Sequence, residues 1–266
     1  NHLIRLSPGH GLNSPMSASW IAQAERLVAQ TRHRLEVEEE FDEYAEEFEE
    51  HLVRVLDYKL PEVLLHKAQQ FPTALHRVVD LGCGTGLCGR ALRSGAALGR
   101  LVGVDLSACM LARAKQEGGY DELYQRDLLA QLQREGSGAV DLLLACDVFI
   151  YLPSLEKVLT EAFRVLRPGG YFFFSTEAAT VEEAPEGLVQ RASGRYAHSR
   201  DYVQGLTEKL RFQILDAETI DLRIEDDLPL PGDCYLLQRP ESLKLQPDDI
   251  GGCHCLPAKT RSLLEK

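Results

Sequence analysis

The chain has 266 residues, an apolar fraction of 44% and a formal net charge of −12. This length and apolar content predict one globular domain with additional segments, and no apolar run reaches the ~18 residues that a membrane-spanning helix needs. The acidic balance argues against nucleic acid as the main partner, because phosphate contacts depend on clustered lysine and arginine.

The N-terminal part is polar and helix-prone from Met16 to about Tyr58. Apolar residues recur in it at helical spacing and predict one apolar stripe. The stripe consists of Phe41, Tyr44, Ala45, Phe48, Leu52, Val55 and Leu56. The intervening glutamates predict a solvated face, with an acidic surface that docks a protein partner as the alternative. We assign residues 1–35 to an N-terminal helical extension, 36–239 to one domain and 240–266 to a C-terminal tail.

The domain alternates between buried strands and helices. Strands are predicted at 77–81, 100–105, 124–128, 140–146 and 171–175, and helices at 62–70, 87–93, 107–115, 153–166 and 199–210. Residues 176–198 are expected to form an irregular insert, and 212–223 and 233–238 a terminal strand pair. The order predicts an α/β fold with a doubly wound, mostly parallel sheet of seven strands.

The run from Val78 to Gly89 is the strongest indication of a ligand site. A buried strand ends there in alternate glycines, which allow a sharp turn and close approach of a ligand, and the next helix directs its positive end to the same place. Leu87 stands where a dinucleotide fingerprint needs glycine, and the lysine of a triphosphate loop is absent. The expected cradle consists of Asp80, Gly82, Cys83, Gly84 and Gly86. Its pattern resembles that of class I S-adenosylmethionine (SAM) methyltransferases, whose Rossmann-like fold has a seven-stranded sheet.

Acidic residues at the ends of the next two strands extend this site toward an adenosine. Asp105 is placed to accept hydrogen bonds from both ribose hydroxyls, with a turn or helix-capping acid as the alternative. Asp127 is placed to take the exocyclic amine of adenine, with the amide of Leu128 on a ring nitrogen, or else is a turn residue. Leu106 and Met110 are expected to cover the adenine, or to be core residues.

The fourth strand is expected to open nearest the transferred methyl group. There, Asp147 is a candidate to favour the sulfonium or orient the acceptor, and Tyr151 to lie against the cation, with helix capping and packing as alternatives. His198 is the candidate catalytic base, because imidazole exchanges protons near neutral pH. A structural histidine is the alternative.

Further segments resemble the bacterial TPR-repeat-containing methyltransferases. The likeness covers about residues 36 to 239 and rests on 41–52, 80–89, 103–107, 120–123, 147–151 and 193–199. It implies SAM as methyl donor, S-adenosylhomocysteine as product, and Tyr44 with the preceding helix as a lid over the methionine moiety. By the same likeness, residues 195–198 close the acceptor side. The acceptor, a small molecule or a protein, stays open.

Two other functions are weighed against methyl transfer. A non-catalytic methyltransferase-like subunit is the first, because the acidic helix offers a docking surface and no general base is assured. A nicotinamide-dependent oxidoreductase is the second, and it lacks the glycine that Leu87 replaces.

Cysteine usage predicts a reducing compartment. The chain holds seven cysteines, an odd number without framework spacing. We expect a cytoplasmic or similarly reducing location, and the first residue, Asn1, leaves a removed targeting segment and an organellar stroma open. Cys253, His254 and Cys255 are spaced more tightly than zinc ligands, so no metal is expected.

Overall fold

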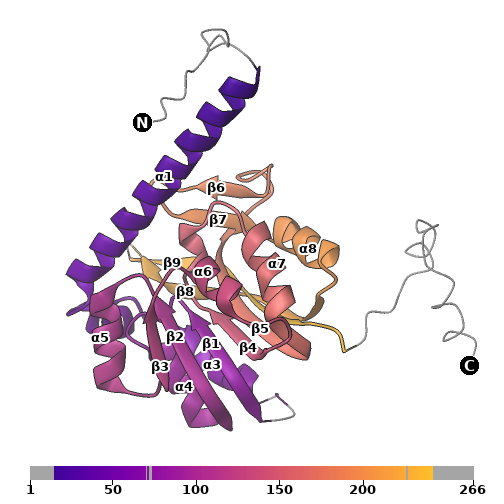
Figure 1. The fold of residues 1–266 in the computed structure, drawn as a ribbon. Coiled ribbons are helices and arrows are strands. Elements are labelled where there is room, and N and C mark those ends of the chain that lie inside the picture. The colour runs from indigo at the N-terminus through magenta and orange to yellow at the C-terminus, as the bar shows by residue number, and fades with distance from the viewer. Residues whose placement is uncertain (1–14, 70, 72–73, 226, 242–266) are drawn as a thin grey trace, which may run out of the picture.

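The structure is a computed structural model that describes residues 15–69, 71, 74–225 and 227–241 (Figure 1). Its strands are β1 (Leu75–Leu81), β2 (Leu98–Asp105), β3 (Glu122–Gln125), β4 (Val140–Ala145), β5 (Leu166–Ala179), β6 (Leu188–Gln190), β7 (Tyr196–Ser199), β8 (Gln213–Glu225) and β9 (Leu228–Gln238). Its helices are α1 (Pro15–Tyr44), α2 (Phe48–Glu50), α3 (Leu60–Ala68), α4 (Leu87–Gly95), α5 (Ala108–Glu117), α6 (Leu128–Arg134), α7 (Glu156–Val165) and α8 (Arg200–Lys209), with a π-helix η1 (His51–Val55) and a 3-10 turn η2 (Phe149–Tyr151).

The strands form one sheet in the order β3-β2-β1-β4-β5-β7-β6. All neighbours from β3 to β7 are parallel, whereas β6 runs antiparallel to β7. The long strand β5 also pairs antiparallel with β9, which pairs with β8. The order reverses beside β1, and open sheets of this kind bind ligands at such a reversal, at the carboxyl ends of the strands.

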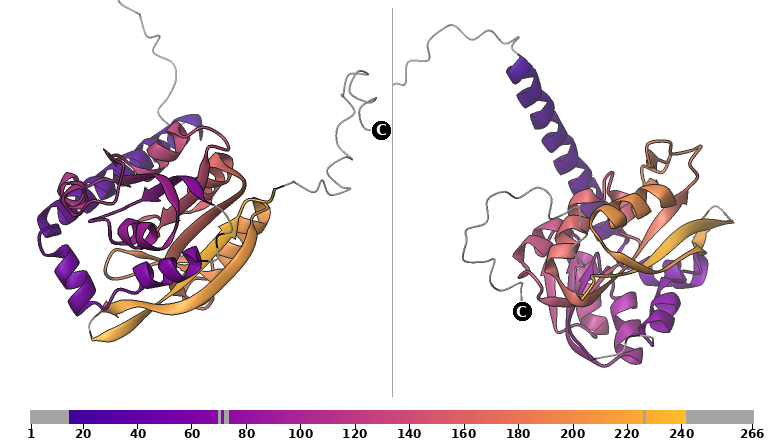
Figure 2. Two further views of the ribbon diagram at one scale, coloured as in Figure 1. Left: turned by 90° about the horizontal axis from the view of Figure 1, so that it is seen from below. Right: turned by 90° about the vertical axis from the view of Figure 1, so that its right-hand side faces the viewer.

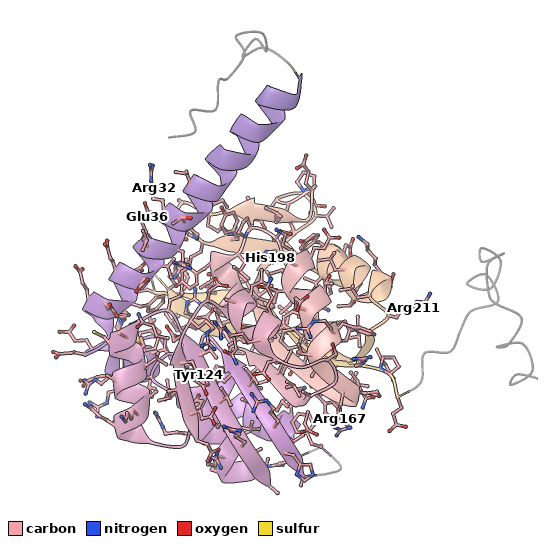
Figure 3. All side chains as sticks on the ribbon, viewed as in Figure 1. Arg32, Glu36, Tyr124, Arg167, His198 and Arg211 are labelled. Atoms are coloured by element: carbon pink, nitrogen blue, oxygen red, sulfur yellow. The ribbon has the colours of Figure 1, made fainter. Side chains whose placement is uncertain are left out.

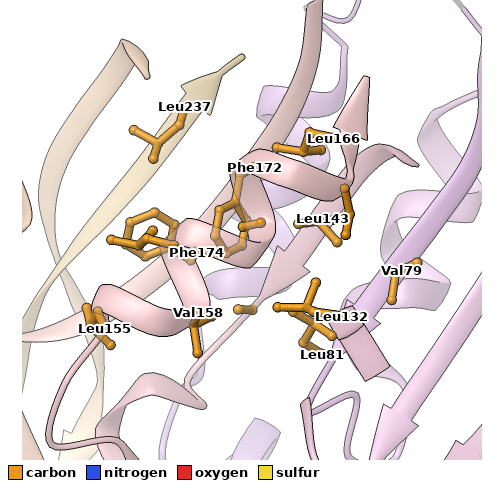
Figure 4. Packing of buried hydrophobic residues seen from close by; sticks show 14 of the residues in the cluster. Val79, Leu81, Leu132, Leu143, Leu155, Val158, Leu166, Phe172, Phe174 and Leu237 are labelled. Atoms are coloured by element: carbon orange, nitrogen blue, oxygen red, sulfur yellow. The ribbon is translucent and has the colours of Figure 1, made fainter. Parts of the chain in front are cut away.

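Helices cover both faces of the sheet, as Figures 1 and 2 show. One face packs Val79, Leu143 and Phe172 against α6, α7 and α8, and Figure 4 shows this cluster from close by. The other face packs Val78 and Phe173 against α3 and α4. Strands β1, β4 and β5 are thus apolar on both sides, which is typical of the centre of a parallel sheet.

Helix α1 lies across the carboxyl ends of the strands, and its N-terminal half projects beyond the body of the molecule (Figures 1 and 2). It crosses the boundary expected between residues 35 and 36 without a break. The helix expected to continue to about Tyr58 instead ends at Tyr44 and resumes as α2 and η1, which carry the chain around the end of the sheet toward α3.

The mostly parallel α/β architecture agrees with the prediction, but the sheet formed by the described residues has nine strands rather than seven. The additional strands β6 and β7 come from the segment expected to be irregular, because the extended end of β5 offers Glu177, Ala178 and Ala179 for pairing. The third strand is also shifted: it ends at Gln125, since Asp127 caps α6. Cys253, His254 and Cys255 lie outside the described residues.

Candidate active site

A cavity of about 920 Å³ lies at the carboxyl ends of β1, β2 and β4. Its floor is formed by the loops that follow these strands, and residues of α1 between Ala29 and Tyr44 form its roof. Residues before α7 and in the β6–β7 turn close the remaining sides. One cavity therefore connects the ends of the central strands, and its size is in the range of small-molecule sites.

Backbone amides of the glycine loop after β1 donate hydrogen bonds to neighbouring residues of the chain. The amide of Gly82 donates to the carbonyl of Val104 at 2.7 Å, and that of Gly84 to the carboxylate of Asp105 at 2.8 Å. Gly82 has a φ of 72°, and a Cβ there would lie 2.5 Å from Cγ2 of Val148. Of the expected cradle, Asp80, Gly82, Cys83 and Gly84 line the cavity, whereas Gly86 does not.

Gly86 instead makes room for an aromatic ring that the sequence analysis did not assign. A Cβ on Gly86 would lie 2.8 Å from the ring of Tyr120, and one on Gly89 would lie 2.1 Å from its hydroxyl oxygen. This hydroxyl donates to the carboxylate of Asp80 at 2.6 Å. Burial raises the pKa of Asp80 to about 6, although the hydrogen bond from Tyr120 opposes the rise.

Thr85 carries an unsatisfied polar atom in the cavity wall. It is 3% exposed, and its Oγ1 has no hydrogen-bond partner among the described residues. Its carbonyl accepts from Arg90, which also pairs with Glu49 of α2. A buried hydroxyl without a partner is rare unless a ligand or water completes it, so this wall fits a polar ligand.

The end of the cavity between β2 and β3 contains most of the residues expected to face adenosine. Asp105, Leu106, Asp127 and Leu128 line it, but Met110 is 1% exposed in the interior and does not. Ser107 caps α5 through the amide of Met110.

Both aspartates at this end also hold the backbone. The Asp105 carboxylate accepts from the amides of Gly84 and Ser107, and burial raises its pKa. Oδ1 of Asp127 accepts from Leu129 and Ala130 as the cap of α6. Oδ2 of Asp127 has no such partner in the described part of the chain, so it can accept a further bond, and the carboxylate of Asp105 can also accept bonds beyond those from the backbone.

The roof is fastened by aromatic and polar contacts. The Tyr44 ring packs edge-on against Phe48 and pairs through its hydroxyl with His51, and Phe41 packs edge-on against Tyr151. Asp42 accepts from the Ser107 hydroxyl at 2.5 Å, which holds its pKa below the usual range. The opposite surface of α1 is exposed, and Figure 3 shows Arg32 and Glu36 pointing away from the body.

A buried ion-pair network lies at the β4 end of the cavity. Asp147 has a φ of 55°, and both of its carboxylate oxygens accept from Nη1 of Arg223, at 2.7 and 2.6 Å. Nη2 of Arg223 donates to Glu177 at 2.7 Å, and both side chains are only 3% exposed. Arg195 adds further ion pairs to Glu177 and Glu225. The Asp147 carboxylate is therefore oriented by Arg223 of β8, which is itself held by Glu177 of β5 and Glu225 of β8.

Tyr151 and His198 differ in access to this end. Tyr151 lines the cavity, and burial raises its pKa well above the ordinary value, so its hydroxyl stays protonated. His198, labelled in Figure 3, does not line the cavity: its side chain is fully buried, and its Nε2 donates to the carbonyl of Leu152 at 3.1 Å. Burial lowers the pKa of His198 to about 4. The structure therefore does not support its expected role as a base, because its side chain is buried and does not line the cavity.

Comparisons with known proteins bear on the same region. Residues 79–174 match the family Methyltransf_11, described as a methyltransferase domain. The chain is 26% identical over 200 residues to a malonyl-[acyl-carrier protein] O-methyltransferase of Legionella pneumophila, covering 71% of this chain and 69% of that protein. It is 43% identical over 120 residues to a trans-aconitate 2-methyltransferase of Azoarcus sp., covering 45% and 46%.

The chain contains a SAM-dependent methyltransferase domain. The matched segment runs from β1 into β5 and includes the glycine loop, Asp105, Asp127 and Asp147. The chain spans less than half of the Azoarcus relative, and the methyltransferases that it matches act on different acceptors, so the match identifies the domain and its methyl donor.

Solved structures show the same fold at low identity. One chain of a complex between the Haloferax volcanii Trm112 methyltransferase activator and a methyltransferase aligns with a TM-score of 0.60 and 21% identity, covering 76% of this chain and 98% of that chain. The [4+2]-cyclase SpnF aligns with a TM-score of 0.58 and 15% identity, covering 69% and 82%. The fold of a methyltransferase domain therefore does not by itself determine the reaction.

Several residues of this methyltransferase domain were missed by sequence reasoning. Tyr120 stands in a segment that carried the family likeness, but nothing in the pattern connects it to Asp80. In the sequence, Arg223 is one polar position in a predicted strand, and the β8–β9 hairpin brings it to Asp147.

None of the α-helices that the structure describes is long and apolar enough to cross a membrane.

Proposed function

We propose that the chain transfers the methyl group of SAM to a small-molecule or protein acceptor and releases S-adenosylhomocysteine. The observation that carries this proposal is one cavity that contains Asp105 and Asp127 at one end and Asp147 and Tyr151 at the other. A donor and an acceptor can lie in it end to end, and such alignment supplies most of what methyl transfer requires. The unpaired Oγ1 of Thr85 supports a polar ligand between the two ends.

We assign residues in each wall of the cavity a contact with SAM. When bound, SAM supplies an activated methyl group. Asp105 accepts hydrogen bonds from the ribose hydroxyls and Asp127 from the adenine amine, while Leu106 covers the ring and the Leu128 amide donates to it. Asp80 and Thr85 contact the methionine moiety, together with Gly82, Cys83 and Gly84, beneath Tyr44. Asp147, held by Arg223, places a negative charge near the sulfonium.

The test is calorimetric titration of the chain with SAM, S-adenosylhomocysteine and NADH, followed by transfer of tritiated methyl groups to a cell extract. We expect both adenosyl ligands to bind and NADH not to bind. The absence of SAM binding would refute the proposal, and NADH binding would favour an oxidoreductase. Binding of SAM without transfer to any fraction would favour the non-catalytic subunit.

We also propose that the chain is most closely related to the bacterial TPR-repeat-containing methyltransferases, that α1 belongs to an N-terminal helical extension, and that its acidic surface docks a protein partner. The location is proposed to be cytoplasmic or another reducing compartment. It is supported by free thiols at Cys83, Cys88, Cys109, Cys146 and Cys234 in the described part of the chain. Mass spectrometry after alkylation without reduction tests it, and a disulfide in freshly isolated protein would oppose it.

A further inference from the structure

The β4 end of the cavity contains a histidine that the sequence patterns did not indicate. His33 of α1 lines the cavity, and its Nε2 lies 3.1 Å from the carbonyl oxygen of Tyr151. A carbonyl oxygen can only accept, so Nε2 carries the proton, and a neutral ring then has its lone pair on Nδ1. Nδ1 has no partner among the described residues and is not a buried atom.

The surroundings of His33 hold the ring in place. Its ring centroid lies 6.4 Å from that of Tyr196 in an edge-on arrangement. The carbonyl group that it binds belongs to Tyr151, whose own ring packs against Phe41, two helical turns further along α1. The imidazole is therefore fixed at one nitrogen by the loop after β4, while Nδ1 has no partner among the described residues and the side chain lines the cavity. General bases are commonly oriented in this way.

We propose that His33 is the general base of the methyl transfer and that the acceptor atom is the oxygen or nitrogen of a group that carries a proton, a hydroxyl or an amine, rather than a carboxylate. This inference rests on the proposed function and adds to it the acceptor class and the residue that takes the acceptor proton. A carboxylate is already deprotonated at neutral pH and needs no base.

The other candidate bases at this end are occupied or poorly placed. Both oxygens of Asp147 are bound by Arg223, and Glu177 is paired in the same network. His198 is buried away from the cavity. Glu40 lines the cavity but is exposed, and a solvated carboxylate is a weaker base than an imidazole.

The proton step balances without another reactant. The O–H or N–H bond of the acceptor breaks, its proton goes to Nδ1 of His33, and its electron pair forms the bond to the methyl carbon. The bond from that carbon to sulfur breaks, and its electron pair remains on sulfur. The protonated ring keeps its hydrogen bond to the Tyr151 carbonyl, because Nε2 carries a proton throughout.

The first test needs no turnover. The full chain, labelled with ¹⁵N-histidine and saturated with S-adenosylhomocysteine, is studied at pH 8 by ¹H–¹⁵N spectroscopy of the imidazole rings, and the signals missing from His33→Gln assign the ring. We expect the proton on Nε2 and an unprotonated Nδ1. A proton on Nδ1 would overturn the proposal, whether or not an acceptor is known.

The second test separates the acceptor classes. Tritiated methyl groups are transferred to the small-molecule and protein fractions of a cell extract, and the products are treated with alkali, which releases methanol from methyl esters but not from ethers or methylamines. We expect alkali-stable label, and a fall of about 10²- to 10⁴-fold in its rate of formation with His33→Gln. The glutamine amide can still donate to Tyr151 but cannot take a proton.

A control variant and a measurement of SAM binding show whether a loss of methyl transfer in His33→Gln is due to the missing base. His66→Gln, an exposed histidine on α3 outside the cavity, should transfer methyl groups at the wild-type rate. His33→Gln should bind SAM within about threefold of wild type, which shows that the roof is intact. Alkali-labile label, full activity of His33→Gln, or a loss seen only with Glu40→Gln would each overturn the proposal. Failure of the wild type to bind SAM would instead refute the proposed function.

Discussion

Replacing Asp80 with asparagine should make the chain more stable and its binding of SAM weaker. The side chain is 1% exposed, and burial raises the pKa of its carboxyl group from 3.8 to about 6. An acid with a raised pKa in the folded state binds its proton more tightly there than in the unfolded chain. The contribution of Asp80 to the free energy of unfolding therefore falls as the pH rises from about 4 to 6, and above pH 6 its full cost remains.

The magnitude follows from the two pKa values. Their difference corresponds to about 3 kcal/mol of destabilisation at pH 8 and to about half of that at pH 5, where the folded-state carboxyl is still largely protonated. The amide oxygen of asparagine can keep the hydrogen bond that the Tyr120 hydroxyl now donates. Asp80→Asn should thus gain up to about 3 kcal/mol at pH 8 and less at pH 5.

Urea unfolding of both proteins at pH 5 and pH 8, with calorimetric titration of SAM at pH 8, measures the two effects. Asp221→Asn, an exposed aspartate on β8, is the control and should leave the free energy of unfolding unchanged at both pH values. Equal stability of wild type and Asp80→Asn at pH 8, or a gain that does not shrink toward pH 5, would refute the reasoning. Unchanged SAM affinity would remove Asp80 from the binding site.

Three further changes test other parts of the site. Arg223→Met should destabilise the chain by about 3–5 kcal/mol in urea unfolding, because the buried Glu177 keeps only its ion pair with Arg195 and Asp147 loses both hydrogen bonds from Arg223; a loss below 1 kcal/mol would contradict this. Asp105→Ala should weaken SAM binding by about 1–3 kcal/mol in calorimetry, and unchanged affinity of a folded variant would contradict the ribose contact. The pKa of His198 is lowered to about 4, so the unfolded chain binds the proton of this ring more tightly than the folded chain does. The free energy of unfolding of the wild type relative to that of His198→Gln should therefore rise between about pH 4 and 6.5, whereas a constant difference would count against this burial.

The order of strands and helices could be predicted because periodicity and caps are local signals. The strand that ends at Asp105 and the helix capped by Ser107 both lie where the sequence places them. The pairing of residues 176–198 with the end of β5 was not predictable in this way, since Leu188–Gln190 and Tyr196–Ser199 are short and become strands only beside an extended partner.

The site was predictable where a residue follows directly from a strand end. Asp105, Asp127, Asp147 and Tyr151 line one cavity because parallel strands bring their carboxyl ends to the same edge. The partners of these residues were not predictable, because they depend on long-range folding. Arg223 reaches Asp147 across 76 positions.

His198 and His33 also show that long-range packing determines which side chains reach the cavity. His198 was favoured because an imidazole exchanges protons near neutral pH, yet β7 places it in the interior. His33 stands in a helix without any motif, and it reaches the cavity only because α1 lies across the strand ends. The sequence pattern around a histidine therefore does not show whether its side chain packs in the interior or takes part in chemistry at the cavity.

The glycine loop illustrates this distinction within the cofactor site. The amides of Gly82 and Gly84 bond to Val104 and Asp105, so they are not free to hold a ligand. The absence of a side chain at Gly82 leaves space for Val148, and its absence at Gly86 and Gly89 leaves space for Tyr120. Tyr120 in turn holds the buried carboxyl group that lines the cavity. Affinity for SAM should therefore depend on the side chains of the wall more than on the loop amides, and the glycines are needed because the residues that orient this wall pack directly against the backbone.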